Sequence, residues 1–557
     1  MKWLNENSRY FLAQGYLTAG VTPEARIKFI AEKAEEILKV KGFANKFYDY
    51  MARGYYSLSS PIWANFGIDK GLPISCFGGH IEDNMSGILY SVAETGMMSK
   101  FGGGTSGYFG DVRPRGATIT NNGHSSGAVH FMQLFESIID VVSQGSTRRG
   151  HYAPYLPLEH PDIEEFLEIG TEGNPIQDLT HGVTVTDKWM EEMVAGDQDK
   201  RRIWAKVIQR RVEIGYPYII FIDAVNQGTV DVYQDKNLKI THSNLCSEIA
   251  LPDHKDWSFV CDLSSMNILY YDEWKNTDAV ETMIYFLDAV MSDFISKLEA
   301  LRDSPKHEDN EAFHFMKRAY NFARDNRALG LGVLGWHSYL QAKMIPFQSQ
   351  EAKRLNTEIF KLIETKSYQA SKELALLLGE APILKGYGRR NTTLNAVAPT
   401  TSSSFILGQV SQSIEPIWSN CYVKDIAKMK VTIFNPALKQ LLIKYGHDNR
   451  ETWQSIRNHD GSVQHLEFLS ELEKEVFKTF EEIDAYEVID QAAARQAFID
   501  QSQSLNLMIN PKMSAKEINE LYLAAWRSRV KSLYYQHSTN AAQKFNQNKL
   551  CGVACEA

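Results

Sequence analysis

The sequence predicts an α/β protein built around a mainly parallel sheet or barrel. Short runs rich in β-branched and aromatic residues alternate with longer segments of helical periodicity, which is typical of βαβ units. The chain has 557 residues, 44% of them hydrophobic, so it can bury a large core. The predicted strands include residues 182–186, 218–222, 258–263 and 393–398, and the predicted helices include residues 129–143, 276–300, 351–378 and 464–483.

The N-terminal region has a helical pattern. Thr22 is a good N-cap, and Pro23 suits the first position of the helix that follows. A second helical pattern covers residues 43–57. We therefore expect an N-terminal helical region over residues 1–58, ahead of a catalytic α/β domain over residues 59–537.

The C-terminal region contains a capped helix, a strand and a tail. Ser514 and Glu517 form a capping box that predicts a helix through Arg529, and residues 531–537 then predict a strand. Residues 538–557 are rich in Asn, Gln and Ala and lack periodicity, so we expect a mobile tail.

The composition excludes several classes of function. The chain carries 59 Lys and Arg against 68 Asp and Glu, a net charge of −9, without a basic stripe, so no nucleic-acid polymer is expected as a partner. Apolar runs typical of signal peptides or membrane spans are absent, which predicts a cytoplasmic protein without membrane attachment.

The six cysteines of a cytoplasmic protein should be reduced thiols, ligands or redox catalysts. Neither zinc-finger nor His-Glu-x-x-His spacing occurs, so we expect no metal on this chain.

The most informative segment covers residues 241–252, THSNLCSEIALP. In an extended strand, alternate side chains share a face, so Asn244, Cys246 and Glu248 would point the same way. An amide, a thiol and a carboxylate within about 14 Å suit a reaction centre: the sulfur breaks bonds, the carboxylate acts as a base, and the amide orients a substrate hydroxyl. The alternative is a strand end with one buried cysteine and two solvated neighbours.

The other cysteines bear on this choice. Cys551 and Cys555 lie on the polar tail, where packing is a weak explanation and metal binding, disulfide exchange and chance remain. Exchange is favoured, because a mobile dithiol can reach both an interior disulfide and an external reductant. Cys76 and Cys261 could each be core cysteines, or could form an interior dithiol facing Cys246.

Together these residues resemble the large, catalytic subunit of class I ribonucleotide reductase. In that family a strand-tip Asn-x-Cys-x-Glu carries a thiyl-radical cysteine, two further cysteines reduce the substrate, a C-terminal pair regenerates them, and a tandem tyrosine relays the radical. The resemblance implies a ten-stranded α/β barrel of the ribonucleotide reductase and glycyl-radical type, with a flexible C-terminal tail. The matching residues occur in the family's order as Cys76, Asn244/Cys246/Glu248, Cys261, Tyr534-Tyr535 and Cys551/Cys555.

The tyrosine pair depends on its position for this interpretation. Adjacent tyrosines in a strand would point to opposite faces, and pairs such as Tyr270-Tyr271 also arise by chance. Tyr534-Tyr535 follows a capped helix and precedes the tail, as in the family. Cys421 belongs to no pattern and is expected to be structural.

The resemblance also implies binding residues. The 398–404 loop, APTTSSS, opens a helical pattern, where N-capping is the ordinary explanation and an anion site the functional one. The GxGxxG over residues 102–107 follows a helix instead of a strand, which argues against a dinucleotide fold. The family's matching regions assign a substrate pocket to Thr401, Ser402, Ser403, Ser60, Ser75 and Gly104, and a specificity-effector site to Asp83, Arg148, Arg149 and the 173–181 loop.

The partners follow from the same resemblance. It implies a small subunit whose dimetal centre supplies the radical, thioredoxin or glutaredoxin as reductant, ribonucleoside diphosphates as substrates, dNTPs and ATP as allosteric effectors, and a homodimer. We expect no cofactor bound on this chain, and no N-terminal ATP-binding module, because the helices that lead into the barrel start almost at Met1. The alternatives are a cobalamin-dependent or glycyl-radical reductase, or a nucleotide-binding thiol-redox protein without radical chemistry.

Overall fold

The structure is a computed structural model that describes residues 1–74, 76–142, 150–426 and 429–538. The strands are β1 (Tyr56–Leu58), β2 (Cys76–His80), β3 (Gly104–Tyr108), β4 (His151–Pro157), β5 (Gly182–Val185), β6 (Tyr218–Phe221), β7 (Phe259–Asn267), β8 (Leu329–Leu334), β9 (Cys421–Ile426), β10 (Met429–Phe434), β11 (Leu507–Ile509), β12 (Ser532–Leu533) and β13 (Gln536–Ser538).

Helices separate these strands along the chain. The first half contains α1 (Glu6–Leu12), α2 (Pro23–Leu38), α3 (Phe43–Arg53), α4 (Ser60–Asn65), α5 (Met85–Lys100), α6 (Ala128–Val141), α7 (Ile163–Leu167), α8 (Asp187–Ala195), α9 (Gln198–Ile214), α10 (Ile222–Gln227) and α11 (Asp231–Asp235). The second half contains η1 (Ile268–Tyr270), α12 (Tyr271–Trp274), α13 (Ala279–Arg302), α14 (His307–Asn326), α15 (Trp336–Ala342), α16 (Gln350–Leu378), η2 (Pro382–Leu384), α17 (Thr401–Ile406), α18 (Pro436–Tyr445), α19 (Arg450–Asn458), α20 (Glu471–Val476), η3 (Phe480–Glu482), α21 (Ala485–Gln496) and α22 (Ala515–Arg527).

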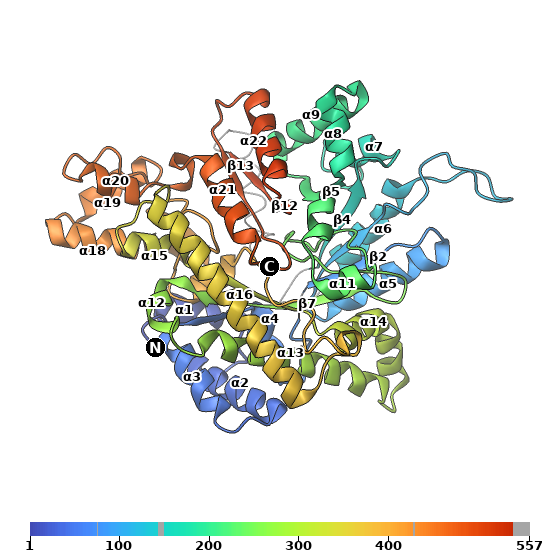
Figure 1. The fold of residues 1–557 in the computed structure, drawn as a ribbon, viewed down its shortest axis with the longest axis horizontal. Helices are drawn as coiled ribbons and strands as arrows, with labels where there is room; N and C mark the ends of the chain where they lie inside the picture. The colour runs from blue at the N-terminus through green and yellow to red at the C-terminus, as the bar shows by residue number, and fades with distance from the viewer. Residues whose placement is uncertain (75, 143–149, 427–428, 539–557) are drawn as a thin grey trace.

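Most strands belong to one sheet with helices outside it (Figure 1). Its order is β1-β7-β2-β3-β4-β5-β6-β12, and β8 pairs with the other edge of β7. The strands from β2 to β6 run parallel, as βαβ units require, whereas β7 runs antiparallel to β2 and β12 antiparallel to β6. The predicted α/β class is confirmed.

The sheet curls, because segments beyond β8 return to β12. Single bridges join β8 to Asn395, and Val397 to Gln503, while Ser532 Oγ of β12 lies 2.8 Å from the Gln503 carbonyl oxygen. The predicted strand over residues 393–398 is therefore extended but pairs only through isolated bridges. Within the described ranges the sheet has nine strands, so the predicted count of ten is not confirmed.

Local capping explains where several helices begin and end. Thr22 accepts a hydrogen bond from the Ala25 N–H and opens α2 as predicted, and the predicted capping box opens α22, which ends two residues before Arg529. The helix predicted over residues 43–57 ends earlier, at Arg53. Gly54 adopts φ of 83°, a left-handed conformation that ends α3, and β1 follows.

The helix predicted over residues 464–483 is wrong. The structure has only α20 and η3 there, and separate capping boxes at Ser470 and Thr479 start them. Two caps of this kind interrupt the backbone ladder of a longer helix. The apolar residues up to Phe477 pack in a second core with Cys421 and Trp453, next to α18, α19 and α20 at one edge of the molecule (Figure 1), whereas Phe480 and Ile483 belong to the main core.

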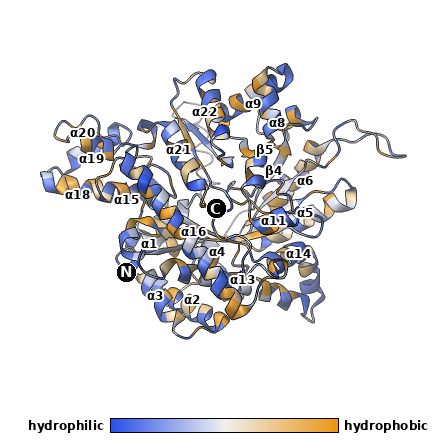
Figure 2. Ribbon diagram, viewed as in Figure 1, coloured by the Kyte–Doolittle hydropathy of each residue, from blue (hydrophilic) through white to orange (hydrophobic). Residues whose placement is uncertain are grey.

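The main core joins the N-terminal helices to the sheet. Leu12 of α1, Phe47 of α3 and Phe77 of β2 belong to one continuous cluster, and the Phe47 ring stacks on Phe286 of α13 with a centroid distance of 4.3 Å. Figure 2 shows that outer helices such as α2 and α16 carry both hydrophilic and hydrophobic stretches, as expected of helices with one buried face. Among the helices of the described ranges, none is long and apolar enough to cross a lipid bilayer.

The continuity of this core predicts that α1 contributes to global stability. Leu12 is fully buried, so Leu12→Ala should lower the free energy of unfolding by about 2–5 kcal/mol in urea denaturation. Leu376→Ala is the matched control, because that side chain is 91% exposed, and its effect should stay within about 0.5 kcal/mol. Equal effects of the two changes would contradict a shared core.

Candidate active site

The segment predicted as a strand around Cys246 is an irregular loop. Cys246 lies in a turn, and Ser247 has φ of 62°, a left-handed value that a regular strand does not contain. The prediction that Asn244, Cys246 and Glu248 share a strand face is therefore wrong. All three residues are nevertheless buried, at 1%, 8% and 1% exposure respectively.

Hydroxyl groups from other elements hold this loop. Tyr155 Oη donates to the Asn244 carbonyl at 2.6 Å, Ser504 Oγ to the Cys246 carbonyl at 2.6 Å, and Ser532 Oγ to the Ser247 carbonyl at 2.9 Å. These bonds satisfy carbonyls that lack strand partners. Serines and a tyrosine of this kind carry no distinctive motif, and sequence reasoning missed them.

Glu248 is placed to act as an acid or a base. Burial raises the pKa of its carboxyl from 4.5 to about 7, although its own backbone N–H, Asn244 and Ser504 oppose the rise by hydrogen bonding. The Ser504 Oγ that donates to the Cys246 carbonyl also lies 3.2 Å from Glu248 Oε2. A pKa near neutrality means that both protonation states are accessible, as general acid–base chemistry requires.

Two further thiols face each other beside this loop. Cys76 of β2 lies directly opposite Cys261 of β7 in the antiparallel register, and none of the described cysteines forms a disulfide. Opposite residues in such a pair have Cβ atoms about 4.5–5.5 Å apart, which suits reversible disulfide formation after small adjustments. Asn244 Nδ2 donates to Cys76 Sγ at 3.7 Å, which links the thiol pair to the loop.

Cys261 is the more protected of the two thiols. Its side chain is almost fully buried, and Gln501 Nε2 donates to its sulfur at 3.4 Å. Burial raises the pKa of the Cys261 thiol well above its usual value, and the Gln501 hydrogen bond opposes this rise. Gln501 lies in no recognisable sequence motif, so its contact with Cys261 is seen only in the structure.

Tyr534 and Tyr535 do not lie in a continuous strand. The predicted strand over residues 531–537 divides into β12 and β13, and the two tyrosines fall between them. Their ring centroids are 4.4 Å apart, and burial together with the nearby Cys246 raises the pKa of Tyr534. Tyr218 of β6 completes a cluster that sequence reasoning missed, at 4.8 Å from Tyr534 and 5.1 Å from Tyr535.

The predicted diphosphate loop lies at the N-terminus of α17. Thr401 begins this helix, and Ser57 of β1 donates through its Oγ to the Ser403 carbonyl at 3.2 Å. Ser402 is buried at 3% exposure. Ser60 begins α4 just after β1, and Gly104 pairs with Cys76 across β3 and β2. The 398–404 loop is thus bonded to β1, which precedes Ser60, and Gly104 lies next to the Cys76 thiol.

The predicted effector residues are only partly described. Asp83 lies between β2 and α5, and Arg113 Nε donates to its Oδ2 at 2.8 Å. Arg113 was not predicted, because no short motif marks it. His181, at the end of the predicted 173–181 loop, instead packs its ring against Phe166 and Tyr216. Other predicted site residues lie outside the described residues: Ser75, Arg148, Arg149, Cys551 and Cys555.

The raised pKa of Glu248 predicts a specific pH dependence of stability. The folded protein holds this proton up to about pH 7, whereas the unfolded chain releases it near 4.5. The stabilisation is therefore complete below about pH 4.5 and is lost as pH rises to about 7. Relative to Glu248→Gln, which cannot titrate, the wild-type free energy of unfolding should fall by about 3 kcal/mol over this range.

Urea unfolding at several pH values measures this difference. Glu520→Gln is the control, because Glu520 is exposed on α22, and its difference from wild type should stay within about 0.5 kcal/mol at every pH. A pH-independent difference for Glu248→Gln would contradict the burial argument.

This chain is similar to known proteins over most of its length. The family described as "Ribonucleotide reductase, barrel domain" matches residues 74–200, 197–383 and 381–536. The putative ribonucleoside-diphosphate reductase large subunit of Frog virus 3 (isolate Goorha) is 37% identical over 511 residues, which cover 88% of this chain and 87% of that protein. The ribonucleoside-diphosphate reductase large subunit of Invertebrate iridescent virus 3 is 33% identical, with 93% of this chain and 91% of that protein covered.

A solved structure is also similar over nearly the whole chain. The Actinobacillus ureae class Id ribonucleotide reductase alpha subunit superposes with a TM-score of 0.90 at 55% identity, and 98% of each chain is covered. The family resemblance predicted from the cysteine, tyrosine and Asn-x-Cys-x-Glu residues is confirmed. This chain belongs to the ribonucleotide reductase large-subunit family.

Proposed function

We propose that this chain reduces ribonucleoside diphosphates to 2′-deoxyribonucleoside diphosphates by thiyl-radical chemistry. The observation that carries the proposal is the convergence of three kinds of groups in one buried region: the Cys246 loop, the opposed thiols of Cys76 and Cys261, and the tyrosine pair. The relatives named ribonucleoside-diphosphate reductase large subunit support the substrate class.

The tyrosines would carry the radical to Cys246. A small partner subunit with a dimetal centre supplies the one-electron oxidant, and the oxidation then passes from Tyr535 to Tyr534. Tyr534 takes the hydrogen atom of the Cys246 thiol and leaves a thiyl radical. The 4.4 Å separation of the two rings supports the first transfer, and the influence of Cys246 on Tyr534 supports the second.

The residues around Cys246 suit the steps on the ribose. The thiyl removes the 3′-hydrogen, Glu248 accepts the 3′-hydroxyl proton, and Asn244 orients the sugar. A carboxyl with a pKa near 7 can accept that proton at neutral pH. The 2′-hydroxyl leaves as water, and Cys76 with Cys261 supply two electrons and two protons and become a disulfide. The hydrogen held by Cys246 then returns to C3′ and Glu248 returns its proton to the 3′-oxygen, which regenerates the thiyl radical. Burial of the site keeps water and other thiols away from the radical.

The substrate's diphosphate would bind at the start of α17. Thr401, Ser402 and Ser403 supply hydroxyls and backbone N–H groups at this helix N-terminus, where an anion is stabilised. Ser60, Ser75 and Gly104 would form the opposite side of the pocket.

Effector binding and dimer formation would involve the region that follows β2, around Asp83, α5 and α6. dNTPs and ATP would bind near Asp83, with Arg148 and Arg149 as partners of their phosphates. A homodimer is supported by large apolar side chains that α5 and α6 expose: Met85, Leu89, Leu134 and Val141. A cytoplasmic location stays a prediction.

The same observations weigh against the alternatives. A cobalamin-dependent reductase needs no tyrosine relay, and the tyrosine cluster beside Cys246 would then have no use. A thiol-redox protein without radical chemistry would leave a buried acid–base group such as Glu248 unexplained. The similarity to a class Id alpha subunit also favours the two-subunit radical mechanism.

Deoxynucleotide formation tests this proposal directly. With a matching small subunit, Cys246→Ser should lower formation of deoxyribonucleoside diphosphates by at least about a thousandfold, because an alcohol does not replace the thiyl radical. Binding of the diphosphates, measured by calorimetry, should stay unchanged. Cys421→Ser is the matched control, since Cys421 packs in the second core, and it should retain activity. Activity in Cys246→Ser, or in wild type without any small subunit, would refute the radical assignment.

The tail cysteines make a separate prediction. We expect Cys551 and Cys555 to reduce the interior disulfide and then to be reduced by thioredoxin or glutaredoxin. Replacing both with serine should lower thioredoxin-driven turnover by at least about a hundredfold but change dithiothreitol-driven turnover by less than about threefold, because a small thiol reaches the interior pair itself. Equal losses with both reductants would argue against the shuttle.

A further inference from the structure

The two thiols of the interior pair differ in access. Cys76 is partly exposed at the start of β2, whereas Cys261 is only 1% exposed within β7. Thiol–disulfide exchange needs a clear approach to the attacked sulfur. A disulfide between them would therefore present one accessible sulfur and one buried sulfur.

The side chain of Gln501 donates a hydrogen bond to the buried sulfur of Cys261. Its Nε2 donates to Cys261 Sγ at 3.4 Å, to the Leu329 carbonyl at 2.9 Å and to Thr393 Oγ1 at 3.1 Å. Its Oε1 accepts the Ala250 N–H at 3.0 Å, which ties it to the loop that carries Cys246. The side chain is fully buried, and its contacts fix the direction of its N–H groups.

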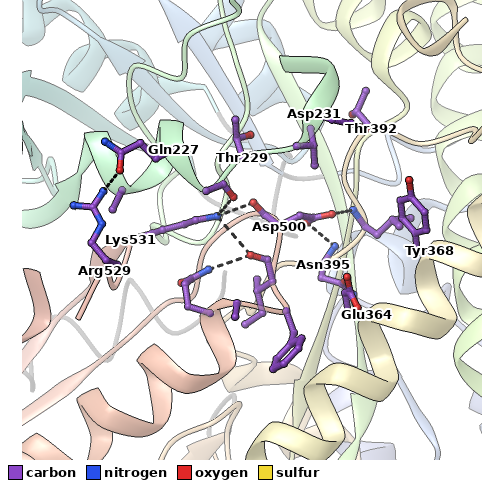
Figure 3. Close-up of a pocket in the computed structure, with 18 of the residues that line it drawn as sticks. Gln227, Thr229, Asp231, Glu364, Tyr368, Thr392, Asn395, Asp500, Arg529 and Lys531 are labelled. Carbon is purple, nitrogen blue, oxygen red and sulfur yellow. Dashed lines mark hydrogen bonds between the residues drawn. The ribbon is translucent and has the colours of Figure 1, made fainter. Parts of the chain in front are cut away.

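The backbone at Gln501 is held as firmly as the side chain. Lys531 Nζ donates to the carbonyls of Gln501, Asp500 and Gly228, each at 2.8 Å. The Asp500 carboxylate accepts the backbone N–H groups of Leu394 at 2.7 Å and Asn395 at 3.0 Å. Figure 3 shows Lys531 extended toward Asp500 at the wall of a cavity of about 580 Å³.

Groups of the protein itself supply hydrogen-bond partners for this polar cluster. Lys531 is saturated by carbonyls, and the Asp500 carboxylate is occupied by backbone N–H groups. These hydrogen bonds hold the segment around Gln501, so the side-chain N–H of Gln501 is oriented before any reaction begins. A donor fixed in advance costs little reorganisation when charge develops on its acceptor.

We propose that reduction of the interior disulfide proceeds by attack on Cys76 and departure of Cys261, and that the Gln501 amide stabilises the departing Cys261 thiolate. The inference rests on the proposed function, in which these two cysteines form the disulfide. It adds the direction of exchange and a catalytic role for Gln501.

Reduction of the interior disulfide takes two exchange steps. An incoming thiolate forms a bond to Cys76 Sγ while the Cys76–Cys261 bond breaks, and that electron pair leaves on Cys261 Sγ. The thiolate then takes a proton from water. A second thiolate of the reductant attacks the mixed disulfide, releases Cys76 and carries away the oxidised dithiol, so two electrons enter the protein.

Gln501 matters because burial makes Cys261 a poor leaving group. Exchange is faster when the departing thiol has a lower pKa. Burial raises the pKa of Cys261, and the N–H of Gln501 is a group that opposes this. Loss of the donor would therefore slow the step in which the thiolate forms.

Trapping of the mixed disulfide tests the direction of attack. The full chain with Cys551→Ser and Cys555→Ser is oxidised with diamide, treated briefly with 2-mercaptoethanol, quenched with iodoacetamide and mapped by mass spectrometry. We expect the mercaptoethanol adduct on Cys76 at least about ten times more often than on Cys261. Adducts mainly on Cys261 would overturn the inference alone. Absence of any Cys76–Cys261 disulfide would overturn the proposed function, and the inference with it.

Substitution of Gln501 tests the leaving-group role. Gln501→Glu replaces the donor by a carboxylate, and Gln501→Met removes it without adding charge. Both should slow reduction by 2-mercaptoethanol by about tenfold or more, the range expected for losing a hydrogen bond to a charged group. The slowing should persist from pH 7 to 9, because it acts on the departing sulfur and not on the attacking thiol.

Gln503→Glu is the matched control. Gln503 is also a buried glutamine, but its Nε2 donates to the Ala492 carbonyl and Gln496 Oε1, and its Oε1 accepts from Arg495. This variant makes the same change at another buried glutamine and should exchange at the wild-type rate. Equal slowing in the Gln501 and Gln503 variants, or no slowing in the Gln501 variants, would overturn the role of Gln501.

Discussion

The whole site depends on hydrogen bonds that hold an irregular loop at the centre of a curled sheet. The carbonyls of Asn244, Cys246 and Ser247 have no strand to pair with, and three hydroxyl groups from other elements supply the missing donors. An unpaired buried carbonyl would cost about 1–3 kcal/mol, so the loop exists only because those donors are in place. Freed from strand pairing, the loop can direct an amide, a thiol and a carboxylate toward neighbouring strands.

Much of the fold and of the chemistry could be predicted from the sequence, because these features are local. The alternation of strand and helix patterns gives the α/β class. The Asn-x-Cys-x-Glu motif points to three residues that the structure does bury together, Asn244, Cys246 and Glu248, although not on a strand face. The conformation around Cys246 could not be predicted, because the left-handed φ of Ser247 depends on donors far along the chain. Gln501 could not be predicted for the same reason, because its hydrogen bond is to Cys261, which lies 240 residues away in the sequence. The count of ten strands, which the family resemblance implied, is not confirmed, because residues 393–398 pair through single bridges.

The site reconciles two opposing demands on its sulfur atoms. A radical sulfur must be shielded, and Cys246 is only 8% exposed in a region lined by tyrosines. A redox pair must be reached by a reductant, and Cys76 lies partly exposed at a strand end. Asn244 connects the two, because it belongs to the shielded loop and donates to Cys76. In the proposed function, this difference in exposure would separate radical chemistry at Cys246 from thiol exchange at Cys76.

The break between β12 and β13 has a mechanical consequence. β12 pairs with β6, with Leu533 opposite Ile219, whereas β13 pairs with β11, with Gln536 opposite Leu507. Tyr534 and Tyr535 lie between these two pairings, which belong to different sheets, and their backbones also form hydrogen bonds with Leu505 and Leu507. In the proposed relay, the 4.4 Å separation of the two ring centroids is therefore set by backbone pairings in two sheets and by the adjoining 505–507 segment, and not by the tyrosine side chains alone.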